Sequence, residues 1–169
     1  MNRTSKLFLN ICVLILLLIG TLTLVGWVFH ITDLVKISSS FAAMTMGTAV
    51  GFILSGLLIL AVTHPRINID KNWSIALDGR LTGVLIGLIL VISGAYLIEH
   101  IFSVDLGIDF AAYHQVMGSN GRSAINTVCG FFLFALGVLS YIKFHQNKHN
   151  SGFRKLPNIF AILVLSIGS

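Results

Sequence analysis

The sequence predicts an all-α fold, a polytopic transmembrane helix bundle built from parallel-repeated helical hairpins. The chain has 169 residues, of which 56% are hydrophobic and 10% are charged, whereas a soluble globular domain carries roughly a quarter charged residues. Uncharged apolar runs recur along the chain, each near the length of about 18 residues that a membrane span requires. Basic residues gather in alternate loops between these runs, which is typical of multi-pass membrane proteins. The expected solvent and first partner is therefore the lipid bilayer.

The first run extends over residues 7–29 and contains no charged side chain. At a rise of about 1.5 Å per residue, it crosses a hydrocarbon core about 30 Å thick. A cleaved signal peptide has an apolar region of only about 7 to 15 residues, followed by a small-residue cleavage site. Because no such site ends this longer run, we interpret it as an uncleaved transmembrane anchor.

Further helices are expected over residues 41–63, 81–102 and 123–142. A fifth run begins near residue 156, where Pro157 suits the first turn of a helix. Only roughly a dozen residues of this run are present, too few to cross a bilayer. The whole of 1–169 is thus read as one membrane domain, and we expect a cytoplasmic output module to follow Ser169.

The orientation follows from the distribution of Lys and Arg. Nine of the eleven basic residues lie before the first run, between the second and third, or after the fourth. Short loops rich in Lys and Arg stay in the cytoplasm, so the N-terminus is predicted to be cytoplasmic and the protein to lie in a bacterial inner membrane. The formal charge of +5 is therefore a topology signal, and no nucleic-acid partner is expected.

An internal repeat joins the second and fourth runs. Met46–Leu57 and Ile125–Leu136 align with five identities in twelve positions, and the helices before them end alike at residues 29–31 and 99–101. Two hairpins in the same direction form a parallel repeat. Small residues in the repeated segments permit close helix approach, and threonine hydroxyls can bond carbonyls of a neighbouring turn or helix. The residues predicted to pack helices are Gly47, Thr48, Gly51, Gly56, Thr127 and Gly130.

Short motifs in a fixed order resemble a known family. They are Gly26-Trp27, Met44-x-x-x-Thr48-Ala49-x-x-Phe52-x-Leu54-x-Gly56, Leu106-Gly-Ile-Asp109 and Gly121-Arg122-x-x-x-Asn126-Thr127. Over residues 7–142 this pattern is similar to an N-terminal multi-helix membrane sensor region of bacterial signalling proteins, which stands ahead of PAS, histidine kinase or diguanylate cyclase modules. The resemblance implies a sensory input region that transmits a membrane or periplasmic stimulus inward, in a homodimer. The second copy departs from the pattern at Ser123, where Met is usual, and at Ala135, where Gly is usual.

The predicted outward side collects the residues that would meet a stimulus. An ionisable group at the membrane edge is costly unless it is paired, so Glu99 is expected to pair with Arg122 at the start of the fourth helix. The alternative for the loop residues is plain solvation. The candidates for an outer sensing face are Glu99, Asp105, Asp109, His114 and Arg122.

His30 and His100 occupy matching positions of the repeat and are the candidate ligands for a haem or a divalent metal. The alternative is that both imidazoles meet interfacial water, and the sequence requires no cofactor. No phosphate-binding loop, Cys-x-x-Cys pair or nucleophile elbow occurs in the sequence, so any catalysis belongs to residues beyond it. Two other classes stay open: a small-solute transporter or channel, and a membrane haem or metal-binding protein.

Overall fold

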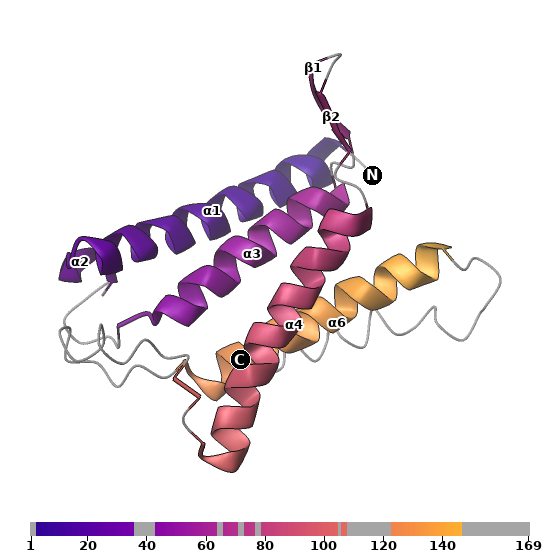
Figure 1. Cartoon of the computed structure of the whole chain (residues 1–169). Helices are drawn as coiled ribbons and strands as arrows, with labels where there is room; N and C mark the ends of the chain where they lie inside the picture. Colours follow the sequence, from indigo (N-terminus) through magenta and orange to yellow (C-terminus); the bar gives the residue numbers. More distant parts are fainter. Residues whose placement is uncertain are drawn as a thin grey trace. The chain divides into compact units, whose positions relative to one another are not determined.

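A computed structural model describes residues 3–35, 43–63, 66–70, 73–76, 79–104, 106–107 and 123–146. The long helices are α1 (Arg3–Val28), α3 (Met46–Thr63), α4 (Gly79–Phe102) and α6 (Ile125–Gln146), with a short α2 (Thr32–Val35) after α1 (Figure 1). The predicted all-helical fold class is confirmed. The predicted fifth helix lies outside the described residues.

Each long helix contains a segment long and apolar enough to cross a membrane: Leu7–Val28, Met46–Thr63, Arg80–Phe102 and Ile125–Lys143. These segments coincide with the four predicted runs. The second begins later than expected, at Met46 rather than residue 41, because Thr45 caps the helix there. The helices therefore fit a multi-pass membrane protein.

A short β-hairpin between α3 and α4 was not predicted. Its strands β1 (Arg66–Asp70) and β2 (Trp73–Ala76) pair antiparallel, with Ile67 opposite Ile75. The register shifts between Asn68 and Asp70, so the pairing contains an irregularity of the kind found in β-bulges.

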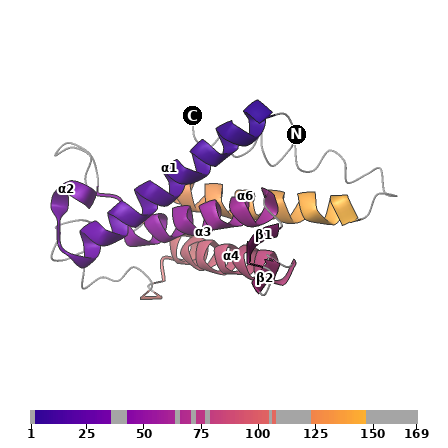
Figure 2. The same cartoon turned by 90° about the horizontal axis from the view of Figure 1, so that it is seen from above.

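The chain divides into two compact units, residues 1–85 with 107–123 and residues 86–106 with 124–169. In the first unit α1 and α3 lie side by side (Figures 1 and 2). They are antiparallel, since Thr23 near the end of α1 contacts Met44 just before α3, whereas Leu17 lies against Gly56 further along α3. One helical hairpin is thus defined by contacts, and the parallel repeat of two hairpins stays a prediction.

The α1–α3 hairpin is closely packed at two glycines. A Cβ atom on Gly20 would lie 2.7 Å from Ile53 Cγ1 and 2.9 Å from the Ala49 carbonyl oxygen. A Cβ atom on Gly56 would lie 3.0 Å from Leu17 Cδ2. Because lipid tails are as apolar as the side chains, close van der Waals packing rather than the hydrophobic effect holds such helices together. The absence of a side chain at both glycines therefore sets the distance between the two helices.

The second unit contains the larger part of α4 and all of α6. A Cβ atom on Gly94 would lie 3.9 Å from Phe132 Cε2, an ordinary van der Waals distance. Ile89 and Tyr96 of α4, with Val128 and Ala135 of α6, are buried. Many large apolar side chains of both units are exposed, among them Val91 at 69%, and such outward apolar faces are suited to lipid contact.

Candidate functional site

The end of α1 is fixed by a backbone motif that places His30. After Val28 the chain turns through His30, whose φ of 58° lies in the left-handed region. The Ile31 N–H then donates to the Gly26 carbonyl, five residues earlier, at 2.8 Å. This is the six-to-one hydrogen bond of a Schellman motif. In a residue other than glycine this left-handed conformation costs about 1–2 kcal/mol, so contacts around His30 must stabilise it. The imidazole Nδ1 lies 3.1 Å from the Trp27 carbonyl oxygen.

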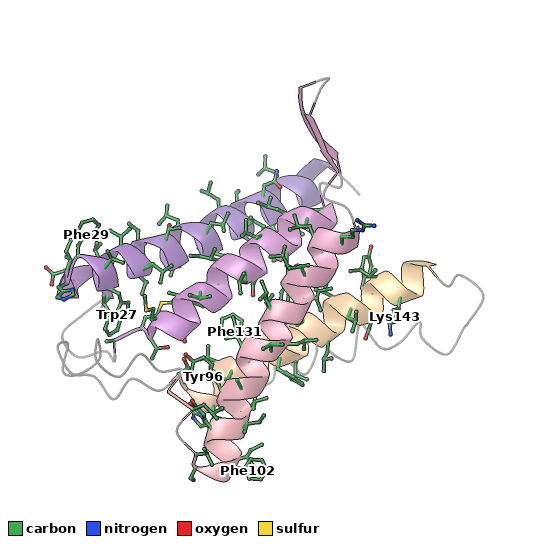
Figure 3. All side chains as sticks on the ribbon, in the orientation of Figure 1. Trp27, Phe29, Tyr96, Phe102, Phe131 and Lys143 are labelled. Atoms are coloured by element: carbon green, nitrogen blue, oxygen red, sulfur yellow. The ribbon has the colours of Figure 1, made fainter. Side chains whose placement is uncertain are left out.

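Trp27 links the end of α1 to the entry of α3. Its side chain is 0% exposed, and its Nε1–H donates to the Met44 carbonyl at 2.9 Å. The Thr23 hydroxyl donates to the Met44 sulfur at 3.4 Å, and the Met44 N–H donates to the Val35 carbonyl at 3.0 Å. Figure 3 shows Trp27 below the C-terminal end of α1 and Phe29 at that end of the helix. We call Thr23, Trp27, Val35 and Met44 the Trp27 junction.

Three hydroxyl groups meet at the start of α3. Thr45 precedes the first helical residue, and its Oγ1 accepts the Thr48 N–H at 3.3 Å, as expected of an N-cap. The same oxygen lies 2.9 Å from Thr48 Oγ1 and 2.6 Å from Ser123 Oγ, and the Thr48 hydroxyl is 3.4 Å from Ser123 Oγ. Ser123 is 3% exposed. This hydroxyl cluster therefore satisfies polar groups that would be costly in an apolar setting.

Replacement of Thr45 by alanine is expected to lower the free energy of unfolding by about 1 kcal/mol, the usual loss for an N-cap. It also removes a partner of Ser123. Thr45→Ser keeps the hydroxyl and is the matched control, expected to stay within about 0.3 kcal/mol of the parent because serine caps as well as threonine. Reversible unfolding in mixed micelles, followed by circular dichroism, measures both. Equal stability of the two variants would contradict the capping role.

Glu99 lies in the last turn of α4 and is 1% exposed. Its Oε1 accepts the Leu106 N–H at 2.8 Å, whereas its Oε2 is buried and has no hydrogen-bond partner among the described residues. Ser103, which follows α4, has a φ of 52° and turns the chain back over the helix end. The predicted partner, Arg122, lies outside the described residues, as do Asp105, Asp109 and His114.

The two histidines of the repeat differ in local structure. His30 stands beyond the end of α1 in a left-handed conformation, whereas His100 is still helical, with Nδ1 3.2 Å from the Tyr96 carbonyl. Within the described ranges, no group of three His, Cys, Asp or Glu side chains is placed to hold a metal ion. The structure therefore offers no observation that brings His30 and His100 into one ligand set.

The predicted packing residues fall into two groups. On α3, Gly51 is buried and Gly56 contacts Leu17, while Gly47 and Thr48 are half-buried. On α6, Thr127 donates its N–H to the Ala124 carbonyl at 3.0 Å, and a Cβ atom on Gly130 would have nothing within 4 Å.

The contacts of four residues at these sites were not predicted from the sequence. Gly20 and Thr45 carry the α1–α3 packing and the α3 cap, and Ser123 and Met44 complete the polar contacts. Met44 and Ser123 stand at matching positions of the repeat, but neither position by itself predicts a hydrogen-bond partner.

Comparison of the chain with protein-family models, curated proteins and solved structures finds no match. The class that the fold defines is that of multi-pass helical membrane proteins, on the strength of four apolar helices of spanning length.

Proposed function

We propose that the chain is the sensory input region of a bacterial signal-transduction protein, a sensor histidine kinase or a diguanylate cyclase. It lies in the inner membrane with a cytoplasmic N-terminus and works as a homodimer. The resemblance of its ordered motifs to such sensor regions is the first support. The second is the placement of its buried polar contacts, which carries the proposal.

In the predicted topology, in which each helix crosses the membrane in turn, the helix ends that carry these contacts fall on one side. The Trp27 junction closes α1 and opens α3, the hydroxyl cluster joins the start of α3 to Ser123 before α6, and Glu99 closes α4. The basic loops occupy the opposite side in the predicted topology. A polar, hydrogen-bonded edge away from the cytoplasm is where an external stimulus would act.

The interior of the spans supports sensing over transport. Arg80, Glu99 and Lys143 are the ionisable Asp, Glu, Lys or Arg residues of the four described spans, and each stands near a span end. Transport paths usually place such groups, or broken helices, near the bilayer midplane. In the proposed mechanism, a stimulus at this polar edge shifts the equilibrium between two alternative packings of the helices. Tight contacts such as Gly20 against Ala49 transmit that change along the helices.

The test has a genetic and a biochemical part. The reading frame beyond Ser169 is expected to encode a kinase or cyclase module, and its absence would contradict the proposal. In the full-length protein, Ser123→Ala is expected to change basal autophosphorylation or cyclic-dinucleotide synthesis at least 3-fold, because it breaks the hydroxyl cluster. Gly130→Ala, at a position with open space around it, is the matched control and is expected to leave output unchanged. Equal output from both variants at equal membrane levels would also count against the proposal.

A further inference from the structure

The hydroxyl group of Thr23 donates to an uncommon partner for a side chain inside a helix. Thr21, Thr63 and Ser93 each donate to the carbonyl oxygen four residues earlier in their helices, which is a usual arrangement for a hydroxyl within a helix. Thr23 donates instead to the Met44 sulfur at 3.4 Å, and Thr23 is 3% exposed. A thioether is a weak hydrogen-bond acceptor. The buried hydroxyl proton is therefore directed at a sulfur that binds it only weakly.

The backbone of Met44 is fixed on both sides, whereas the residue as a whole is half-buried. Its N–H donates to the Val35 carbonyl at 3.0 Å, and its carbonyl accepts the Trp27 Nε1–H at 2.9 Å. The methionine side chain is unbranched, has three rotatable bonds and adapts its shape to its surroundings. The sulfur can therefore change its position without breaking the backbone contacts that join α1 to α3.

We propose that Met44 is a site of reversible oxidation to methionine sulfoxide, and that the Thr23 hydroxyl binds the sulfoxide oxygen. Hydrogen peroxide is the oxidant. A lone pair of the sulfur attacks one peroxide oxygen, so that an S–O bond forms and the O–O bond breaks. The hydroxide that leaves takes the proton of the transferred OH group and becomes water. The sulfur loses two electrons and the peroxide gains them. Methionine sulfoxide reductases, with a thiol as the reductant, reverse the step.

The donor at Thr23 suits a sulfoxide better than a thioether. A sulfoxide is polar, and its burial without a donor is costly. O–H···O bonds are about 2.7–2.8 Å long, and the Met44 sulfur already lies 3.4 Å from the hydroxyl oxygen, so a small shift of the methionine side chain brings the new oxygen within range. Oxidation thus strengthens the contact between α1 and the residues that lead into α3. The inference rests on these contacts and is independent of the proposed signalling function.

The experiment follows oxidation and amide hydrogen exchange by mass spectrometry in the full-length protein in nanodiscs. Cys12 and Cys129 are replaced by alanine, so that their thiols do not consume the peroxide. Met46 lies two residues further along the chain and is also half-buried. Because susceptibility to oxidation follows exposure, peroxide is expected to convert Met44 at a rate within about 3-fold of the rate at Met46. If Met44 stays reduced while Met46 is oxidised, the proposal is overturned.

The effect of the sulfoxide is then measured as amide exchange of the peptide that contains Met44, in a Met46→Leu background where Met44 is the methionine of that peptide. Oxidation is expected to slow this exchange about 5-fold, the change for one added hydrogen bond of ordinary strength. Treatment with a sulfoxide reductase is expected to restore the original rate. Met44→Leu, which peroxide does not oxidise at this position, is the control for general damage and is expected to show no change.

Variants of Thr23 determine whether its hydroxyl is responsible. Thr23→Ser keeps the hydroxyl and is expected to respond to oxidation as the parent does. Thr23→Val has nearly the same shape but no donor, so the buried sulfoxide is unpaired and oxidation is expected to speed exchange by about 5-fold or more. A change in the same direction in the parent and in Thr23→Val overturns the proposal, and so does an unchanged rate in the oxidised parent.

Discussion

Replacement of Trp27 by alanine is expected to lower the free energy of unfolding by about 3 kcal/mol. Loss of a buried aromatic side chain costs about 3–5 kcal/mol in soluble proteins. The lower end of this range applies here because the separated helices of the unfolded state lie in lipid, not water, so that burial of an apolar side chain gains less free energy. The change opens a cavity at a fully buried position and leaves the Met44 carbonyl without its donor. Both losses fall on the junction that joins α1 to α3.

Trp27→Phe separates the two contributions. Phenylalanine keeps most of the apolar volume but has no N–H. The free energy of unfolding is therefore expected to fall by about 1 kcal/mol, the usual contribution of one hydrogen bond. Unfolding in mixed micelles, followed by circular dichroism at helical wavelengths, measures both variants. If Trp27→Ala is as stable as Trp27→Phe, packing at Trp27 does not hold the hairpin together.

Replacement of Gly20 by alanine is expected to destabilise the hairpin by about 1–3 kcal/mol, the range for overpacking of a close contact. The added methyl group would stand 2.9 Å from the Ala49 carbonyl oxygen, a backbone atom that cannot rotate away. The helices must then separate. Reversible unfolding in mixed micelles, followed by circular dichroism, measures the loss of stability in Gly20→Ala.

Gly83→Ala is the matched control for this change. Its position is also helical, but a Cβ atom there would have nothing within 4 Å. The same substitution is therefore expected to be neutral or to stabilise by up to about 1 kcal/mol through helix propensity. A loss of stability at Gly83 as large as that at Gly20 would show that helical glycine itself, and not the close approach of α1 and α3, is what matters.

The helices were predictable because one physical requirement fixes them. A bilayer admits only backbone whose polar groups are satisfied internally, so an uncharged run such as residues 7–29 has few alternatives to a helix. The contact of Gly56 with Leu17 also follows the general rule that small residues mark close helix approach.

The details of the candidate site were not predictable in the same way. Gly20 stands in a run of apolar residues without a distinguishing pattern, and its role depends on which residue of α3 lies opposite. The sequence predicts that Glu99 is costly at the membrane edge, but its bond to the Leu106 N–H depends on the backbone turn at Ser103. Likewise, the matched spacing of His30 and His100 gave no sign that one stands beyond a helix end and the other within a helix.

The β-hairpin shows a further limit. Residues 66–76 contain alternating apolar and polar positions such as Ile67 and Asn68. The run is short, and the charged residues in and around it predict membrane topology rather than strands. Strand pairs of this length depend on their turn and register, which apolar periodicity does not report.

A topology map of the full-length protein in intact cells tests the four-span arrangement directly. Single cysteines placed at residues 5, 72, 104 and 145, in a background without Cys12 and Cys129, are labelled with a membrane-impermeant reagent before and after lysis. Four spans with a cytoplasmic N-terminus predict labelling before lysis at 104 alone, and at 5, 72 and 145 only after lysis. Labelling of 72 and 104 from the same side would show that α4 does not cross the membrane and would contradict the four-span arrangement.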